Sequence, residues 1–216
     1  TIDKCVSSLK AQTLKQCEFI FVDDCSTDDT VEKLTSLTQD DNRFIILRQE
    51  KHFDPFQSRK RGIATATGEY IMFLDADDTF IPKACEKAYK IITRKNVDLF
   101  LFGSNAVQTE ASSKKAIKGY RQYLRFENKI RGLYRTKEEC RELYFKESGF
   151  GFSTSLAKKI FKAEILKQAM NELNPMLYLG YGQDLYQLIA TMPYISSIYA
   201  NNHYVLHNYF IGEGAT

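Results

Sequence analysis

The chain has 216 residues, of which 44% are hydrophobic and 26% charged, and its formal net charge is +3 at pH 7. This length can bury a full core, and the composition is that of a globular protein rather than a disordered or fibrous one. The mild net charge gives no reason to expect a nucleic-acid partner, and no apolar stretch is long enough to span a bilayer.

The five cysteines are odd in number, and none are spaced as CxxC or as zinc ligands. We therefore expect free thiols in a reducing compartment, and a cytoplasmic protein, rather than a disulfide framework. The sequence starts without Met and without a signal-like segment and reads directly into a helical pattern, so it looks trimmed at its start.

Helical and extended patterns alternate through the first hundred residues. Apolar residues at Ile2, Val6 and Leu9 predict a short helix, which a strand over residues 18–22 follows. The remaining patterns predict helices over residues 26–37, 58–67 and 82–94 and strands over residues 44–47, 70–74 and 97–102. This βαβα order predicts a three-layer α/β fold with a mostly parallel sheet.

The second half begins with a basic, aromatic segment over residues 106–149. Such a segment can form an anionic-membrane or nucleic-acid surface, but interspersed glutamates favour a solvated helical insertion. Beyond it we expect helices over residues 156–170 and 184–192 and extended chain over residues 194–209.

Carboxylates follow two of the predicted strands at the point where each strand ends. Asp23 and Asp24 follow the first strand, and Asp75, Asp77 and Asp78 follow the strand over residues 70–74. The carboxyl ends of parallel strands meet at one edge of a sheet, where open α/β sheets bind ligands. Converging carboxylates repel one another unless a cation or a hydrogen-bonding ligand lies between them. The pattern predicts a divalent metal, Mn²⁺ or Mg²⁺, and a phosphorylated ligand.

The order and spacing of these elements resemble the family 2 glycosyltransferases, the inverting enzymes of the GT-A fold. Residues 22–28, Val-Asp-Asp-Cys-Ser-Thr-Asp, look like the opening of that family, and residues 66–78, which end in Asp-Ala-Asp-Asp, are similar to its DxD block. Residues 155–166, 182–185 and 203–209 resemble its weaker C-terminal pattern.

The resemblance implies a Rossmann-like GT-A fold in a single catalytic domain. Residues 1–105 would form the nucleotide-sugar-binding half, and residues 106–216 an acceptor-side half with the basic insertion at 106–149 and a helical C-terminal part. The family's first strand, which precedes the opening helix and contributes to the nucleotide pocket, is absent from this sequence.

The resemblance also implies roles for the residues of the two acidic turns. Asp24 and Asp23 would accept hydrogen bonds from uracil and ribose. Asp77, together with Asp75, would hold the metal ion. Asp75 would also face the sugar or ribose, and Ala76 would belong to the same nucleotide-sugar-binding turn.

Two residues outside these turns complete the implied site. Asp184 aligns with the family's general base, and Arg59 would reach a phosphate. Without the resemblance, Asp184 is interpreted as a helix N-cap or first-turn acid. For Arg59, a place on a solvated helix face is as plausible an interpretation as a phosphate contact. Gln183 stands where the family usually has Glu, Cys25 where it has Gly and Lys60 where it has Asn, which puts the fine geometry in question.

The implied function is metal-dependent transfer of a single sugar from a nucleotide sugar, taken to be a UDP sugar, to an acceptor hydroxyl with inversion. A glycan or glycolipid of a bacterial surface polysaccharide or lipooligosaccharide would be the acceptor, with peripheral association at the inner face of the membrane. The absence of Trp and of a QxxRW-like segment disfavours processive synthases. The sequence leaves open the donor sugar, the linkage and the oligomeric state.

Three alternatives compete with this interpretation. The run from Asp75 to Thr79 also fits the DxDxT signature of haloacid-dehalogenase-type phosphatases, with Asp75 as nucleophile and Asp77 as acid/base, but a downstream acidic pair is missing. A phospho-accepting receiver module would use Asp23 and Asp24, yet the chain is too long and has no evident strand-end Lys. A third alternative is a weakly active homologue that binds nucleotide sugar, given Gln183.

Overall fold

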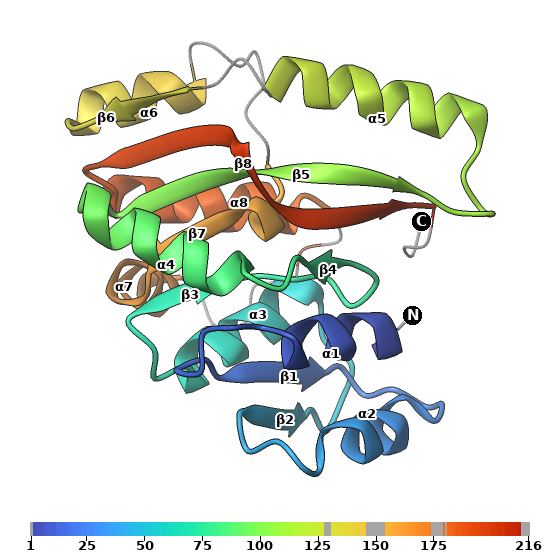
Figure 1. The fold of residues 1–216 in the computed structure, drawn as a ribbon. Helices are drawn as coiled ribbons and strands as arrows, with labels where there is room; N and C mark the ends of the chain where they lie inside the picture. The colour runs from blue at the N-terminus through green and yellow to red at the C-terminus, as the bar shows by residue number, and fades with distance from the viewer. Residues whose placement is uncertain (1, 128–130, 146–153, 174–178, 180, 213–216) are drawn as a thin grey trace.

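The computed structural model describes residues 2–127, 131–145, 154–173, 179 and 181–212. The first half runs α1 (Ile2–Lys10), β1 (Phe19–Asp23), α2 (Thr30–Thr38), β2 (Phe44–Arg48), α3 (Pro55–Thr65), β3 (Tyr70–Met72), β4 (Thr79–Phe80), α4 (Ala84–Lys95) and β5 (Leu99–Gln108). The second half runs α5 (Lys114–Glu127), β6 (Arg131–Tyr134), α6 (Lys137–Phe145), the 3₁₀ turn η1 (Leu156–Lys158), β7 (Lys159–Lys162), α7 (Ala163–Glu172), α8 (Gln183–Thr191), the 3₁₀ turn η2 (Met192–Tyr194) and β8 (Ile198–Ile211). Figure 1 shows their arrangement.

The strands form two sheets. β1 and β2 pair in parallel, and a six-stranded sheet has the order β3-β7-β5-β8-β4, with β6 also pairing with β8. In the larger sheet β5 and β8 are parallel, whereas β3 and β5 each run antiparallel to β7, and β4 and β6 antiparallel to β8.

The expected mostly parallel sheet is therefore not confirmed, because the larger sheet is mixed. β3 and β5 do point the same way, but β7 is inserted between them in the opposite direction. β7 lies inside the stretch over residues 156–170 that the apolar pattern predicts as one helix. Only Ala163–Glu172 is α-helical there, because the four residues of β7 are too few to show a strand period.

The core has two sides, and β5 contributes to both. Leu99 and Leu101 pack in one cluster with residues of α3, α6, α7 and α8, while Phe100 and Phe102 pack in a second cluster with α1 and α4. This alternation is what a strand buried on both faces requires. Helices thus cover both faces of the sheet, and the three-layer α/β architecture is confirmed (Figure 1).

A cavity of about 1030 Å³ separates β1 from β3. Residues 19–22 of β1, residues 70–72 of β3 and one side of α3 line it. Within the described residues β1 pairs only with β2, and β3 only with β7, so both strands turn an unpaired edge to the cavity. The cavity therefore lies between two strand edges that have no strand partner in the described part of the chain.

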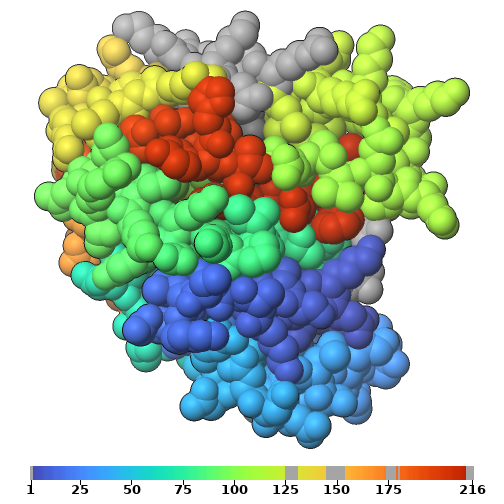
Figure 2. All heavy atoms as spheres, viewed as in Figure 1, coloured from blue at the N-terminus to red at the C-terminus, as the bar shows by residue number. Residues whose placement is uncertain are grey.

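The basic segment is helical in part. Lys114, Lys115, Lys118 and Arg121 of α5 are exposed, and Figure 2 shows α5 side chains projecting from the surface beside β8. On its inner face Tyr120 stacks on Tyr209 of β8 with ring centroids 4.5 Å apart. The same segment also supplies strand β6, and the predicted division after residue 105 falls inside β5.

The structure can be compared with two predictions from the sequence, one on the cysteines and one on membrane-spanning segments. All five cysteines are free thiols. None of the helices in the described part of the chain combines the length and apolarity that a transmembrane span needs.

Candidate active site

The acidic turn after β3 lies at the mouth of the cavity. The backbone N–H of Asp78 donates to the carbonyl of Asp75 at 3.0 Å and closes the turn. Asp75 and Ala76 line the cavity, and 53% of the Asp75 side chain is exposed. Asp77, between Ala76 and Asp78, is half-buried.

The turn carries an excess of negative charge. The pKa of the Asp75 carboxyl is raised, first by its removal from bulk water and then by the like charges of Asp184, Asp78 and Asp77, against the opposing effect of Arg59. Burial and the negative charges of Asp78, Asp77 and Asp75 raise the pKa of the neighbouring Cys5 thiol to about 12. This potential favours a bound cation.

Arg59 joins the acidic turn to Asp184, the candidate general base. Its position on α3 brings Nη1 to 2.6 Å from Oδ1 of Asp184 and Nη2 to 3.9 Å from Oδ1 of Asp75. Only 19% of the Arg59 side chain is exposed, so solvent screens these ion pairs less than it would on an open surface. The tertiary fold thus brings together three predicted site residues from β3, α3 and α8.

Asp184 is held as an oriented carboxylate rather than as a helix cap. It is the second residue of α8, whose N-cap is Gly182 in the left-handed conformation with φ 73° and no side-chain cap. Oδ2 accepts a hydrogen bond from the N–H of Leu156 at 3.2 Å, while Oδ1 faces Arg59. Asp184 is therefore a first-turn acid, as one half of the alternative interpretation predicted, and not the N-cap.

The carboxylates of Asp23 and Asp24, at the end of β1, accept hydrogen bonds from other parts of the chain. The Asp23 side chain is only 4% exposed, and its carboxylate accepts from the N–H of Ser26 at 3.2 Å. Asp24 accepts from Nε2 of Gln49 and from the N–H of Phe53, both at 2.7 Å, and remains 23% exposed. Asp24 thus shapes the connection between β2 and α3, and its exposed part is what a nucleotide could reach.

Asp54 is a site-supporting residue that the sequence patterns missed. It is 2% exposed and caps α3, with Oδ1 accepting from the N–H of Gln57 at 2.8 Å. Oδ2 accepts from the N–H of Leu179 at 2.6 Å and so ties the start of α3 to the chain that leads into α8. The signal was present as Asp before Pro55, because an acidic N-cap followed by Pro at the first helical position marks a helix start.

Asp75 and Asp77 fit a metal ion that is bound partly by the protein and partly by the diphosphate of a ligand. In the described ranges no group of three or more His, Cys, Asp or Glu side chains is arranged to hold an ion. Mg²⁺ commonly binds through one or two carboxylates and substrate phosphate oxygens rather than through an all-protein cage. Asp75 and Asp77, at an exposed turn with unbalanced negative charge, match that kind of site.

The mixed sheet, its helical layers and an acidic turn at a strand end define the GT-A fold. The chain belongs to glycosyl transferase family 2, whose sequence profile matches residues 1–161. The profile match extends beyond the first hundred residues, where the family-specific motifs lie.

Two relatives illustrate the resemblance in sequence. The chain is 35% identical over 98 residues to the glycosyltransferase GlyG of Streptococcus pneumoniae serotype 4, a match that covers 45% of this chain and 33% of that protein. It is 29% identical over 120 residues to the GalNAc(5)-diNAcBac-PP-undecaprenol beta-1,3-glucosyltransferase of Campylobacter jejuni, covering 55% and 38% of the two chains. The chain therefore spans about a third of the length of these curated relatives.

Solved structures agree on the fold. S. aureus TarS 1-349 in complex with UDP-GlcNAc superimposes with a TM-score of 0.71 at 20% identity, over 99% of this chain and 56% of that one. The complex of the same protein with UDP gives a TM-score of 0.68 at 19% identity, over 97% and 56% of the two chains.

Proposed function

We propose that the protein transfers a single sugar from a UDP sugar to an acceptor hydroxyl, with a divalent metal ion and inversion at the anomeric carbon. One observation carries the proposal: Arg59 joins Asp184 to Asp75 at the mouth of the cavity between β1 and β3. Arg59 thereby couples a base candidate to an acidic, cation-favouring turn. The UDP and UDP-GlcNAc complexes of TarS support the choice of donor.

The proposed chemistry assigns one task to each group. The acceptor oxygen attacks the anomeric carbon from the face opposite the nucleotide, the bond from that carbon to the UDP oxygen breaks, and Asp184 takes the acceptor's proton. Asp77 and Asp75 would hold Mn²⁺ or Mg²⁺, which supplies Lewis-acid stabilisation of the departing diphosphate. Arg59 fixes the Asp184 carboxylate and adds positive charge next to that diphosphate.

Asp24 and the acceptor side belong to the same proposal. The exposed part of Asp24 would accept hydrogen bonds from uracil or ribose, with Asp23 holding the turn beneath it. We propose a glycan or glycolipid acceptor and action at the inner face of the membrane. The name of the Campylobacter jejuni relative, which specifies a PP-undecaprenol-linked glycan, supports a lipid-linked acceptor.

Membership of family 2 removes the support for the phosphatase and receiver alternatives. The weakly active homologue remains the second candidate, because Gln183 replaces the usual Glu. Nε2 of Gln183 donates to the carbonyl of Leu179 at 2.8 Å, so the residue takes part in holding the chain before Asp184.

Ligand-dependent thermal stability tests the donor and the metal together. UDP should raise the melting temperature more with Mn²⁺ than with a chelator, because the metal offsets repulsion between the diphosphate and the turn. At a hundred times its dissociation constant a ligand stabilises the fold by about 2.7 kcal/mol. Asp77→Asn should abolish the difference between Mn²⁺ and chelator, whereas Asp40→Asn, at a side chain 74% exposed, should leave it intact.

Two results would contradict the proposal. An equal response to UDP with Mn²⁺ and with chelator would exclude the metal role. Magnesium-dependent hydrolysis of an aryl phosphate that Asp75→Asn abolishes would instead identify a phosphatase.

A further inference from the structure

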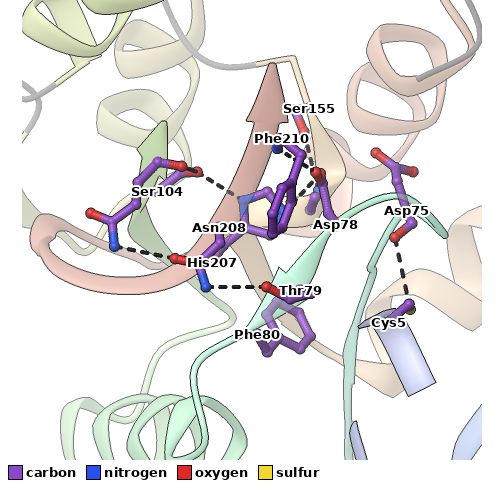
Figure 3. Close-up of polar contacts among 12 residues, drawn as sticks. Cys5, Asp75, Asp78, Thr79, Phe80, Ser104, Ser155, His207, Asn208 and Phe210 are labelled. Atoms are coloured by element: carbon purple, nitrogen blue, oxygen red, sulfur yellow. Dashed lines mark hydrogen bonds and ion pairs between the residues drawn. The ribbon is translucent and has the colours of Figure 1, made fainter. Parts of the chain in front are cut away.

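Three polar side chains that the proposed chemistry does not use are buried directly behind the acidic turn. Asp78, His207 and Ser104 are 1%, 2% and 7% exposed. Nε2 of His207 lies 3.0 Å from Oδ2 of Asp78, and Nδ1 lies 2.9 Å from Oγ of Ser104. Figure 3 shows the three side chains pointing toward one another, with Asp75 on the other side of the turn.

This arrangement is not a hydrolytic triad, although it contains the same residue types. A serine nucleophile needs access to substrate, and the Ser104 hydroxyl is buried between β5 and β8. The ring is also reversed relative to a protease triad, since Asp78 is on Nε2 and Ser104 on Nδ1. The network therefore acts on the protein and not on a substrate.

Asp78 belongs both to the turn and to the network. Its backbone N–H closes the turn on the carbonyl of Asp75, while its side chain faces the opposite way and binds β8. Oδ1 accepts from the N–H of Phe210 at 3.1 Å, and Oδ2 faces His207, so both oxygens are held by one strand. Any displacement of β8 relative to the turn breaks these contacts.

β4 continues the same connection. Thr79 and Phe80 pair with Asn208 and His207 in an antiparallel ladder directly after the turn. Nδ2 of Asn208 donates to Oγ1 of Thr79 at 3.1 Å. Ser104 then links His207 to β5, a strand with a fully buried core segment, so the turn is braced through β8 to the centre of the sheet.

We propose that Asp78, His207 and Ser104 form a positioning network that fixes the turn bearing Asp75 and Asp77 at the angle needed to bind the metal–diphosphate unit. The inference rests on the proposed function. It adds to the site three residues that touch neither metal nor substrate and act only by holding the turn in place. Mg²⁺ and Mn²⁺ demand regular coordination geometry, and the repulsion among the turn's carboxylates pushes the turn away from it. A buried, fully bonded anchor opposes that displacement.

The test compares two histidines of the same strand. His207→Ala removes the centre of the network, and His203→Ala, at an exposed position of β8, is the matched control. We expect His207→Ala to raise the Mn²⁺ concentration that half-saturates UDP-dependent stabilisation by about tenfold or more, as is usual for residues that orient metal ligands. Affinity for UDP in the presence of a chelator should change by less than about twofold, because uracil contacts lie at Asp24.

Milder variants keep the test decisive if His207→Ala does not fold. Ser104→Ala removes one contact of the ring and should shift the Mn²⁺ midpoint in the same direction by about twofold to fivefold. Ser104→Thr, which keeps a hydroxyl, should restore the wild-type midpoint. A merely structural role would lower the melting temperature without ligand and leave the Mn²⁺ midpoint unchanged.

The outcomes separate this inference from the proposed function. A wild-type protein without any Mn²⁺-dependent response to UDP would overturn the proposed function. A normal wild-type response with unchanged midpoints in folded His207→Ala and Ser104→Ala would overturn the positioning network alone. A shift in His203→Ala as large as in His207→Ala would also overturn it, since the effect would then belong to β8 in general.

Discussion

At the scale of single residues, Arg59 pairs with two carboxylates of the candidate site. Its guanidinium is 2.6 Å from Asp184 and 3.9 Å from Asp75, so the closer pairing is with Asp184. Under the proposed function, a bound diphosphate would add negative charge next to Arg59 and the acidic turn.

Asp184→Asn tests the role of this carboxylate. The amide keeps the shape of the side chain but cannot take a proton, so sugar transfer should fall by about a hundred- to ten-thousandfold. The affinity for UDP with Mn²⁺ should change little, because the base touches the acceptor and not the leaving group. Transfer is measured as UDP release in the presence of acceptor, with Asp40→Asn as control.

Two results would change the assignment of Asp184. Loss of both transfer and UDP affinity would mean that Asp184 supports the fold or the metal site through Arg59 and Leu156. Full activity of the Asn variant would leave the base unassigned.

At the scale of secondary-structure elements, Asp98 connects three strands at one end of the larger sheet. It precedes β5 and is 8% exposed. Oδ1 accepts from Nζ of Lys162, the last residue of β7, at 2.9 Å. Oδ2 accepts from the N–H groups of Ser196 and Ser197, just before β8, at 2.8 and 3.0 Å. The central position of β7 therefore depends in part on one carboxylate.

We expect Asp98→Asn to lower the free energy of unfolding by about 1.5–3 kcal/mol, the range for hydrogen bonds to a charged group. Burial alone would raise the pKa of Asp98, but the hydrogen bonds from Lys162, Ser196 and Ser197 hold it below its ordinary value. The pKa of Lys162 is raised, chiefly by its hydrogen bond to Asp98.

The lowered pKa of Asp98 and the raised pKa of Lys162 set how the stability difference between wild type and Asp98→Asn depends on pH. The contribution of Asp98 is complete above its unfolded pKa of about 3.9 and is lost as the pH falls through the lower folded-state pKa. The contribution of Lys162 is complete below about pH 10.4 and is lost as the pH rises through its higher folded-state pKa. Urea unfolding should therefore show a constant difference between wild type and variant near neutral pH that shrinks at both extremes.

At the scale of the whole molecule, the cavity between β1 and β3 divides the sheet structure in two. Apolar side chains line much of the cavity, and both strand edges that face it lack a strand partner within the described residues. The N-terminus of α1 lies at the same end as the arrowhead of β1 in Figure 1. A strand parallel to β1 would therefore lead directly into α1.

We propose that an added strand in this cavity would join the two sheets. A six-residue segment with β-branched residues at alternate positions, fused ahead of Thr1, should raise the free energy of unfolding, because it would pair with both open strand edges and fill the apolar cavity. A segment of equal length with Pro at its centre should give no gain, because Pro cannot donate to the ladder. Equal midpoints of urea unfolding for the two fusions would refute this use of the cavity.

Local sequence patterns were enough to predict the alternation of elements in the first half, the family resemblance and the acidic turns after β1 and β3. These features are local: an apolar run of five residues, a capping residue or a carboxylate at a strand end can be read without knowing what lies beside it. Asp54 shows the limit of that reading, since its Asp-Pro pattern marks a helix start but its hydrogen bond to Leu179 joins residues far apart in the chain.

The tertiary structure alone decided the direction of β7, the pairing of Arg59 with Asp184 and the burial of Asp78 with His207. Each of these depends on which distant segments pack together, and a strand's choice of partner follows from the packing of whole faces rather than from the pattern of the strand itself. His207 lies 129 residues from Asp78, and their contact exists only because β8 pairs with both β4 and β5. Local patterns thus predicted the acidic turn, while long-range pairing determined what holds it in place.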